Sequence, residues 1–205
     1  MVESLSERFI TVKYNDLLEL SKDAATGIDF EKLICEFSNH GINKDVEDFL
    51  KNKAGQYDKM HMAKTYLVLD KGLTCICGYF SVVARSLIIK KKDWQKLSNN
   101  KKKVLNPFGY RKDEDQNIPA ILLGQLGKNW NSNLKISGFD LLNIAITTCK
   151  EVSDTVGGRY LYLEADDNEK LASFYTDNGF SYLSYPGGEF YHTKNDQVLF
   201  IMKFG

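Results

Sequence analysis

The chain is 205 residues long, and its 27 Lys and Arg residues balance its 27 Asp and Glu residues. This length fits one domain or a tightly joined pair of domains. The zero net charge argues neither for nor against a nucleic-acid partner, and the 43% of hydrophobic residues supply enough apolar material for a core.

Export, membrane insertion and a structural zinc site are not expected. The opening residues, MVESLSERF, contain no apolar signal segment, and no apolar run approaches membrane-spanning length. The four cysteines, at positions 35, 75, 77 and 149, lack the paired spacing of a zinc site. We therefore expect a cytoplasmic protein with reduced thiols, no membrane partner and no metal.

The first half of the chain predicts a strand, two helices and a hairpin. Residues 9–12 are β-prone, Asp29 precedes a helical pattern that ends near Gly41, and Asp45 has the position of an N-cap for a second helix. From Thr65 the pattern changes to two antiparallel strands joined at residues 71–72, the second of which is one long strand or two strands with a break at Gly78.

Residues 90–117 are rich in lysine and predict the least structured part of the chain. Trp94, Phe108 and Tyr110 interleave with the basic residues. Such a segment is either a solvated loop or a surface for a polyanion, and basic groups mixed with aromatic rings suit single-stranded or looped RNA. The basic residues are Lys90, Lys91, Lys92, Lys96, Lys101, Lys102, Lys103, Arg111 and Lys112.

Residues 118–142 predict a buried strand, a polar turn and the start of a helix. Ile121–Leu123 is a continuous apolar run, residues 127–137 have turn composition, and apolar residues recur at helical spacing from Gly138. Free backbone N–H groups and the helix dipole make such a helix start an anion site, although most strand–turn–helix units bind nothing. The turn matches neither a Walker A loop nor a GxGxxG fingerprint.

The remainder predicts a strand at 160–164, a helix that begins at Asn168 and ends at Asn178 and Gly179, and two closing strands. Strands and helices thus share one α/β (α+β) chain. We see no internal repeat and no second domain boundary.

Two segments resemble the GNAT superfamily of N-acetyltransferases. In NEKLASFYTDNGF, the residues Asn168, Leu171, Phe174, Tyr175, Gly179 and Phe180 stand at the spacing of a helix of that family. The six positions Asn133, Leu134, Lys135, Ile136, Ser137 and Gly138 correspond to its acetyl-CoA loop, of which the final glycine is retained.

The resemblance implies a GNAT fold over residues 1–205 as a single domain, with a lysine-rich insertion at about 90–117. Its central sheet would be mixed, with an antiparallel N-terminal half, a V-shaped splay at the acetyl-CoA site and flanking helices. A more specific pattern, in Asp45–Ala54, Lys64–Asp70, Gly78–Phe80 and Ile118–Leu126, is similar to the GNAT toxins that acetylate the amino group of aminoacyl-tRNA.

The resemblance also assigns roles. The backbone of Leu123, Gly124, Gln125 and Leu126 would hold the pantetheine arm of acetyl-CoA, and the N–H of Leu123 would stabilise an oxyanion. The loop from Asn133 to Gly138, together with Asn168, would contact the rest of the cofactor, with Lys135 and the Ser137 hydroxyl on phosphate. Tyr175 would be the general acid that protonates the departing thiolate, since a phenol is protonated at neutral pH.

A general base is harder to identify. Many relatives carry a glutamate on the central strand, where this chain offers Gln125 and no carboxylate. Glu164, Asp166 or His192 could serve through water, but each also fits an ordinary surface or loop position. An acceptor amine of low pKa, such as the α-amine of an aminoacyl ester, would need no strong base.

Three functions stay open from the sequence. The first is an acetyl-CoA-dependent N-acetyltransferase whose acceptor is either aminoacyl-tRNA or a small-molecule or protein amine. The second is a catalytically inactive CoA-binding module, and the third is an interaction protein that binds RNA through the basic segment. A homodimer and an antitoxin partner are compatible with the resemblance, which establishes neither.

Overall fold

The computed structural model describes residues 5–107 and 114–205, and its strands form one seven-stranded mixed sheet and one two-stranded sheet. The chain divides into two units, which we call unit 1 (residues up to 83, and 123–147) and unit 2 (84–122 and 148–205). In sheet order, the large sheet contains β1 (Phe9–Lys13), β2 (Lys64–Asp70), β3 (Ile76–Ala84), β6 (Ala120–Lys128), β7 (Tyr160–Ala165), β9 (Val198–Lys203) and β8 (Ser181–Tyr182).

The predicted mixed sheet with an antiparallel N-terminal half is confirmed. β1 pairs with β2 and β2 with β3, in both cases antiparallel, whereas β6 pairs with β7 in parallel. The parallel pairing joins Ala120–Leu122 to Tyr160–Tyr162, that is, the first three residues of β6. The predicted V-shaped splay beyond this point and the single domain over residues 1–205 stay predictions.

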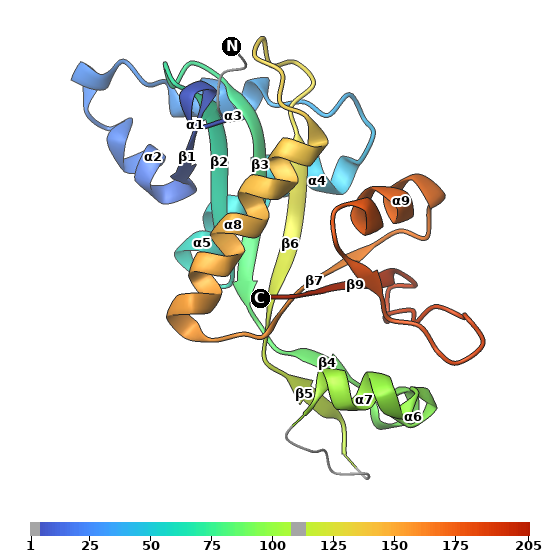
Figure 1. Ribbon diagram of the computed structural model, residues 1–205. Helices are drawn as coiled ribbons and strands as arrows, with labels where there is room; N and C mark the ends of the chain where they lie inside the picture. The colour runs from blue at the N-terminus through green and yellow to red at the C-terminus, as the bar shows by residue number, and fades with distance from the viewer. Residues whose placement is uncertain (1–4, 108–113) are drawn as a thin grey trace. The chain divides into compact units, whose positions relative to one another are not determined.

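In unit 1, helices cover both faces of the antiparallel strands. Tyr79 of β3 faces a core cluster built from α2 (Tyr14–Leu20), α3 (Phe30–Glu36) and the helical stretch after it. Its neighbour Gly78 faces the other side of the sheet, where the part of α8 (Gly138–Val156) that belongs to unit 1 packs on β3 through Leu141 (Figure 1). The remaining helical segments of this unit are α1 (Leu5–Arg8), η1 (Ala24–Thr26), α4 (Lys44–Asp48), the π-helical η2 (Phe49–Lys53) and α5 (Ala54–Lys59).

Gly78 does not break the second hairpin strand, contrary to one sequence expectation. A Cβ at this position would lie 2.9 Å from two side-chain carbons of Leu141, so the glycine allows α8 to pack closely on β3. The strand instead ends at Ala84, and β4 (Leu87–Ile89) follows. The close packing of α8, and not a break in the strand, thus explains the glycine at this position.

The predicted helix starts are right in one case and shifted in the other. Asp29 caps α3 by accepting a hydrogen bond from the N–H of Lys32, although the helix ends at Glu36, before Gly41. The second helix is capped by Asn43, whose side chain accepts from the N–H groups of Asp45 and Val46. Asp45 therefore lies in the first turn, where its charge suits the helix dipole.

In unit 2 the lysine-rich segment is largely structured, which corrects the sequence prediction. Within residues 90–107 and 114–117 it forms α6 (Lys91–Lys96) and α7 (Asn99–Leu105), and it leads into β5 (Gln116–Ile118), which pairs with β4. Its apolar residues hold it in place, because Trp94, Leu97 and Leu105 are buried in a core cluster shared with β7 and β9. Phe108, Tyr110, Arg111 and Lys112 lie outside the described residues.

At least four of the lysines also have partners inside unit 2, and Lys90 and Lys96 form ion pairs with Asp115 and Asp93. The ammonium of Lys101 donates to the backbone oxygen and the hydroxyl of Ser184, both at 2.6 Å, and Lys102 donates to the backbone oxygen of Gln95. Partial burial lowers the pKa of Lys101. These contacts favour a structural role for Lys101 and Lys102 over phosphate binding.

The closing elements follow the prediction. Helix α9 (Glu169–Asp177) is followed by Asn178 and by Gly179, whose φ of +87° places it in the left-handed region that suits a helix end. In the described part of the chain, no helix combines the length and apolarity needed to cross a membrane. The same residues hold no cluster of three or more His, Cys, Asp or Glu side chains able to bind a metal ion.

The two tryptophans give a direct test of this packing. Replacing Trp94, which is 1% exposed, with alanine should lower the free energy of unfolding by about 3–5 kcal/mol, because it leaves a large cavity. Trp130→Ala is the control, since that side chain is 42% exposed and its loss should cost less than about 1 kcal/mol. Urea unfolding measures both. If Trp94→Ala were as stable as the unmodified protein but no longer bound RNA, the result would contradict the packing role and support the hypothesis that the segment binds RNA through its aromatic and basic residues.

Candidate functional site

The predicted cofactor residues lie in two separate groups. Those from Leu123 to Gly138 follow one another along β6 and the segment that connects it to α8, all within unit 1. Asn168 and Tyr175 lie at the start and in the body of α9, in unit 2.

In the second half of β6, a buried leucine is followed by a solvent-exposed glycine. Leu123 is buried, Gly124 is exposed, and Gln125 and Leu126 are half-buried. A side chain at Gly124 would come within 3.0 Å of the Ser81 hydroxyl on the same unit. The glycine thus leaves backbone accessible at the position where the pantetheine arm was predicted.

The start of α8 is capped by Ser137, which was predicted to contact phosphate. Its hydroxyl accepts from the N–H of Asp140 at 3.0 Å and donates to the Asp140 carboxylate at 2.6 Å. This arrangement is a short version of the capping box, and it satisfies one of the free N–H groups of the helix. The N–H groups of Gly138 and Phe139, in the same first turn, have no acceptor within an α-helix.

Ile136 does not obstruct this segment. Its side chain is 1% exposed and packs into unit 1. The bulky residue at a position where the GNAT loop carries glycine therefore contributes to the core.

Three cationic side chains converge on the connecting segment. Lys135 donates to the backbone oxygen of Trp130 at 2.7 Å, Arg8 donates to the backbone oxygen of Lys135 at 3.2 Å, and the ammonium of Lys128 lies 4.5 Å from the centre of the Trp130 ring. Among the described residues, none of the three forms an ion pair with a carboxylate. Their charge is therefore available to an anion.

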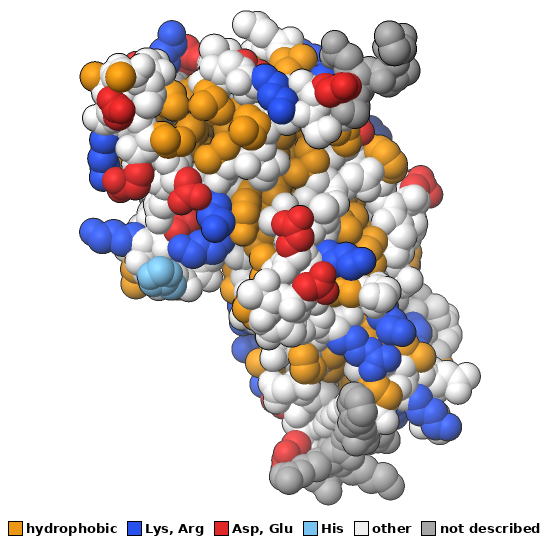
Figure 2. Space-filling view, turned by 60° about the vertical axis from the view of Figure 1, so that its left-hand side comes forward, with side chains coloured by type: hydrophobic (Ala, Val, Ile, Leu, Met, Phe, Trp, Pro, Cys, Tyr) orange, Lys and Arg blue, Asp and Glu red, His pale blue; other side chains and the backbone are white. Residues whose placement is uncertain are grey.

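This concentration of charge is local. On the face shown in Figure 2, Lys and Arg side chains are interspersed with Asp and Glu. Of the three cations, only Lys135 was predicted from the sequence to contact phosphate. The pattern Lys128–Trp130–Lys135 is visible in the sequence, but the contribution of Arg8 requires the fold.

Tyr175 is held by an aromatic cluster of unit 2. Its ring centre lies 5.0 Å from that of Phe200, 5.1 Å from Phe174 and 5.7 Å from Phe180, and the residue is 8% exposed. Burial raises the pKa of its hydroxyl to about 12. The phenol is therefore protonated at neutral pH and chemically able to act as an acid.

Asn168 has a structural role that explains its residue type. Its side chain accepts from the N–H groups of Lys170, at 2.9 Å, and Leu171, at 3.4 Å, and so caps α9. The predicted contact of Asn168 with the cofactor stays a prediction.

The three candidate bases lie on the surface of unit 2. Glu164 is exposed on β7, and Asp166 accepts from the amide of Gln197 at 3.2 Å. Both ring nitrogens of His192 are next to carboxylates, with Nδ1 3.0 Å from Asp196 and Nε2 3.7 Å from Asp167. These contacts fit a surface network, and we assign no general base.

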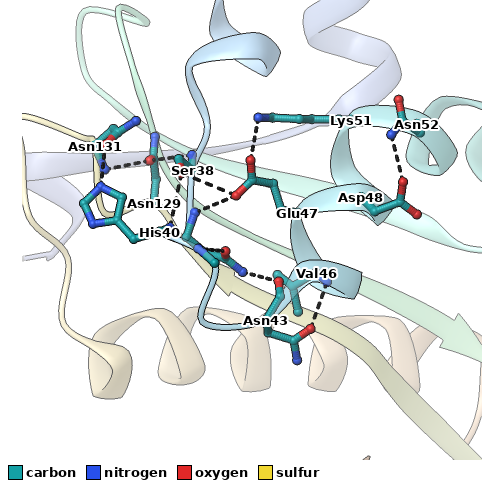
Figure 3. Close-up of polar contacts among 12 residues, drawn as sticks. Ser38, His40, Asn43, Val46, Glu47, Asp48, Lys51, Asn52, Asn129 and Asn131 are labelled. Carbon is teal, nitrogen blue, oxygen red and sulfur yellow. Dashed lines mark hydrogen bonds and ion pairs between the residues drawn. The ribbon is translucent and has the colours of Figure 1, made fainter.

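A polar cavity in unit 1 was not anticipated from the sequence. It has a volume of about 430 Å³ and opens between the segment after α3 and the α4–η2 helix (Figure 3). Its lining residues are Ser38, Asn39, His40, Gly41, Lys44, Glu47, Asp48, Lys51 and Asn52. The toxin-like pattern at 45–54 contributes several of these polar residues, and nothing in its spacing indicates a cavity.

Glu47 organises that cavity. One carboxylate oxygen accepts from the N–H of Asn39 at 3.0 Å, and the other accepts from the ammonium of Lys51 at 2.7 Å. The hydrogen bond from Lys51, followed by that from Asn39, lowers the pKa of Glu47. A carboxylate held ionised in this way is a poor proton acceptor and acts as an anchor.

The cavity rim is fixed to the segment that leads to α8. His40 Nε2 lies 2.6 Å from the side-chain oxygen of Asn131 (Figure 3). The N–H of Trp130 donates to the backbone oxygen of Ser38 at 2.8 Å. The cavity and the predicted acetyl-CoA segment therefore share one support.

No known family model matches the chain. Solved structures do match it. AtaT complexed with acetyl-methionyl-tRNAfMet is 20% identical, with a TM-score of 0.62 over 94% of this chain and 93% of that one. A tyrosine-to-phenylalanine variant of KacT is 19% identical, with a TM-score of 0.62 over 94% of each chain. AtaTR bound with acetyl-CoA is 18% identical, with a TM-score of 0.56 over 94% and 92%. The chain has the GNAT fold of these toxins, which confirms the fold inferred from the sequence.

The Ser137 cap can be separated from any contact with phosphate. Ser137→Ala should lower the free energy of unfolding by about 0.5–2 kcal/mol, because it removes the N-cap of α8. Ser137→Asn is the matched variant, since asparagine accepts the same bond and should keep most of the stability. Urea unfolding tests both, and equal stability of Ser137→Ala and the unmodified protein would contradict the capping role.

Proposed function

We propose that the chain is an N-acetyltransferase that transfers an acetyl group from acetyl-CoA to the α-amine of aminoacyl-tRNA. The observation that carries the proposal is the shared fold, over 94% of the chain, with AtaT in complex with acetyl-methionyl-tRNAfMet. An acetyltransferase for a small-molecule or protein amine is the alternative. The neighbouring toxins have also been solved with an antitoxin, and an antitoxin partner for this chain belongs to the proposal.

The residues of unit 1 fit an acyl-CoA. Backbone is accessible at Gly124, and the first N–H groups of α8 have no acceptor within the helix, so they can be donated to a phosphate. Arg8, Lys128 and Lys135 add positive charge beside them for the phosphates. Side-chain cations would thus replace much of what glycine N–H groups supply in a typical GNAT loop.

When bound, acetyl-CoA would supply an acetyl group already activated as a thioester. The chain would hold it along Leu123–Leu126 and orient it against the amine, since orientation provides much of the rate in such reactions. The N–H of Leu123 would donate to the carbonyl oxygen as negative charge develops there. Tyr175 would give its proton to the departing sulfur.

The absence of a carboxylate at Gln125 is consistent with an α-amine acceptor. A free α-amine has a pKa of about 7.7–8.0, against about 10.4 for a lysine side chain, so a large fraction of it is neutral at physiological pH. Such an amine can attack without a strong general base. This chemistry favours aminoacyl-tRNA over protein lysine.

The acceptor can be identified by thiol release. Purified protein and acetyl-CoA should release free CoA with charged tRNA, and should not do so with deacylated tRNA or tRNA whose aminoacyl group is already acetylated. A lysine peptide tests the alternative acceptor. Equal turnover on the peptide would sink the tRNA assignment, and calorimetric binding of acetyl-CoA without turnover on any amine would identify an inactive CoA-binding module.

Tyr175→Phe tests the proton donor. It should lower kcat by about 10²–10⁴-fold, the usual contribution of a positioned acid, with little change in the affinity for acetyl-CoA. Tyr182→Phe is the control, because that ring also packs on Phe200 but has no assigned role. Steady-state kinetics and calorimetry measure the two effects. Full activity in Tyr175→Phe would show that another group protonates the sulfur.

The pH profile tests the same residue independently. With a pKa of about 12, Tyr175 should keep its proton throughout the range from pH 7 to 10, so kcat should rise as the acceptor amine loses its proton and should not fall by pH 10. The raised pKa weakens the folded state only above about pH 10, where an unfolded tyrosine begins to ionise. Initial rates corrected for hydrolysis of the aminoacyl ester provide the measurement. A fall in kcat between pH 8 and 9, on folded protein, would exclude Tyr175 as the acid.

A further inference from the structure

We propose that Cys75 and Cys77 form a redox-reactive dithiol that peroxides convert to an intramolecular disulfide, and that this closure releases the hydroxyl of Ser132. The inference does not depend on the acetyltransferase assignment. It rests on the geometry of three side chains in unit 1: Cys75 just before β3, Cys77 at its start, and Ser132 in the segment between β6 and α8.

The two sulfur atoms are unusually close for residues two apart in an extended chain, with Cys75 just before β3 and Cys77 within it. They lie 3.9 Å apart, whereas residues at this spacing on a regular strand are separated by about 6.6–6.8 Å along the backbone. The cause is a β-bulge. Val68 pairs with Gly78 and Leu69 with Ile76, so Cys77 is the additional residue on β3. A bulge redirects its side chain, here towards Cys75.

Ser132 completes the cluster. Its hydroxyl oxygen lies 3.4 Å from the sulfur of Cys75 and 3.5 Å from that of Cys77. Because the same hydroxyl also bonds to the backbone oxygen of Leu134 at 2.8 Å, it connects the dithiol to the segment before α8.

The two thiols differ in environment, and this assigns their order of reaction. Cys75 is half-buried and accessible, whereas Cys77 is fully buried and burial raises the pKa of its thiol to about 12. The thiolate is the form that reacts with peroxide, so Cys75 is the site of attack.

The reaction balances with hydrogen peroxide as oxidant. The sulfur of Cys75 attacks one peroxide oxygen, the O–O bond breaks, and a sulfenic acid and one water form. The sulfur of Cys77 then attacks the sulfur of Cys75, the S–O bond breaks, and the hydroxyl leaves as water with the thiol proton of Cys77. Each sulfur loses one electron, and the peroxide is reduced to two waters.

Closure requires the sulfur atoms to move about 2 Å closer, to the disulfide length of about 2.05 Å. Both thiol contacts of Ser132 change as this happens. A disulfide between residues two apart is also strained, and strained disulfides are readily reduced. The modification should therefore be reversible by dithiothreitol.

Mass spectrometry provides the test. The native chain is treated with one to two equivalents of hydrogen peroxide, quenched with N-ethylmaleimide under denaturing conditions and digested with trypsin. Residues 72–85, between Lys71 and Arg85, form one peptide that contains both cysteines. We expect the oxidised peptide to carry no maleimide and to be about 2 Da lighter, by two hydrogen atoms, than the unlabelled dithiol peptide. Treatment with dithiothreitol before the quench should restore the addition of two maleimides.

Two variants and two internal controls make the result decisive. Cys75→Ser should abolish the 2 Da loss, and Cys77→Ala should leave a sulfenic acid on Cys75 that dimedone traps. Cys35, which is exposed, and Cys149, which is buried, should not form a disulfide with either residue. Oxidation of Cys35 while residues 72–85 still react with two maleimides would overturn the proposal.

The consequence for Ser132 needs its own readout. Trp130, two residues away, becomes the only tryptophan in a Trp94→Phe variant, and its emission should shift on oxidation and recover on reduction. The Cys75→Ser form of the same variant should show no shift. Unchanged Trp130 emission in protein with a verified disulfide would refute the coupling to Ser132.

Discussion

The arrangement of unit 1 depends on the buried side chain of Asn129. Its amide nitrogen donates to the backbone oxygen of Ile76 at 2.7 Å, and its amide oxygen accepts from the N–H groups of Ser38, at 3.1 Å, and Asn131, at 3.0 Å. Its own N–H donates to the backbone oxygen of Cys77 at 3.0 Å. One residue, 3% exposed, thus joins β3, the segment after α3 and the segment that follows β6.

The energetics of this residue explain why so many features share its support. A buried amide is tolerated only when its donors and acceptor are paired. Removing one partner leaves a buried polar group unpaired, which lowers the free energy of unfolding by about 1–3 kcal/mol for each such group. The cavity rim at Ser38, the dithiol at Cys77 and the approach to α8 therefore cannot move independently at low cost. A change at one of them is transmitted to the others through hydrogen bonds that have no solvent to replace them.

Local sequence patterns predicted most of the helices and strands, because apolar residues recur with a characteristic period in each kind of element. The helix cap at Asp29 and the helix end at Gly179 follow from single residues with specific backbone roles. Gly78 shows the limit of such reasoning, since the same residue type serves a chain break or a close helix contact, and only tertiary packing against Leu141 distinguishes them. The segment 90–117 was misjudged for a related reason: its lysines are visible in sequence, but the burial of Trp94 is not.

Some features of the candidate site could likewise be predicted from the sequence, and others depend on the fold. Tyr175 was selected by motif spacing, and the aromatic cluster that raises its pKa could not be read from any one segment, because Phe200 is 25 positions away. Ser137 was selected for its hydroxyl, but a serine directly before a helix is first of all an N-cap, and the structure gives it that role. Arg8 was not selected at all, since it reaches Lys135 only through the pairing of β1 with β2 and the packing of unit 1.

The start of α8 finally shows which groups the proposed anion site would use in place of the usual glycines. In a glycine-rich loop, backbone N–H groups approach the phosphate directly, and the site depends on chain conformation. Here Asp140 already occupies part of the first turn as the partner of Ser137, and its negative charge opposes an incoming phosphate. Lys128, Lys135 and Arg8 lie outside the helix and have no carboxylate partner among the described residues, so they can offset that charge. Recognition would then rest on long side chains whose attraction for phosphate is screened by salt, in place of a rigid backbone cradle.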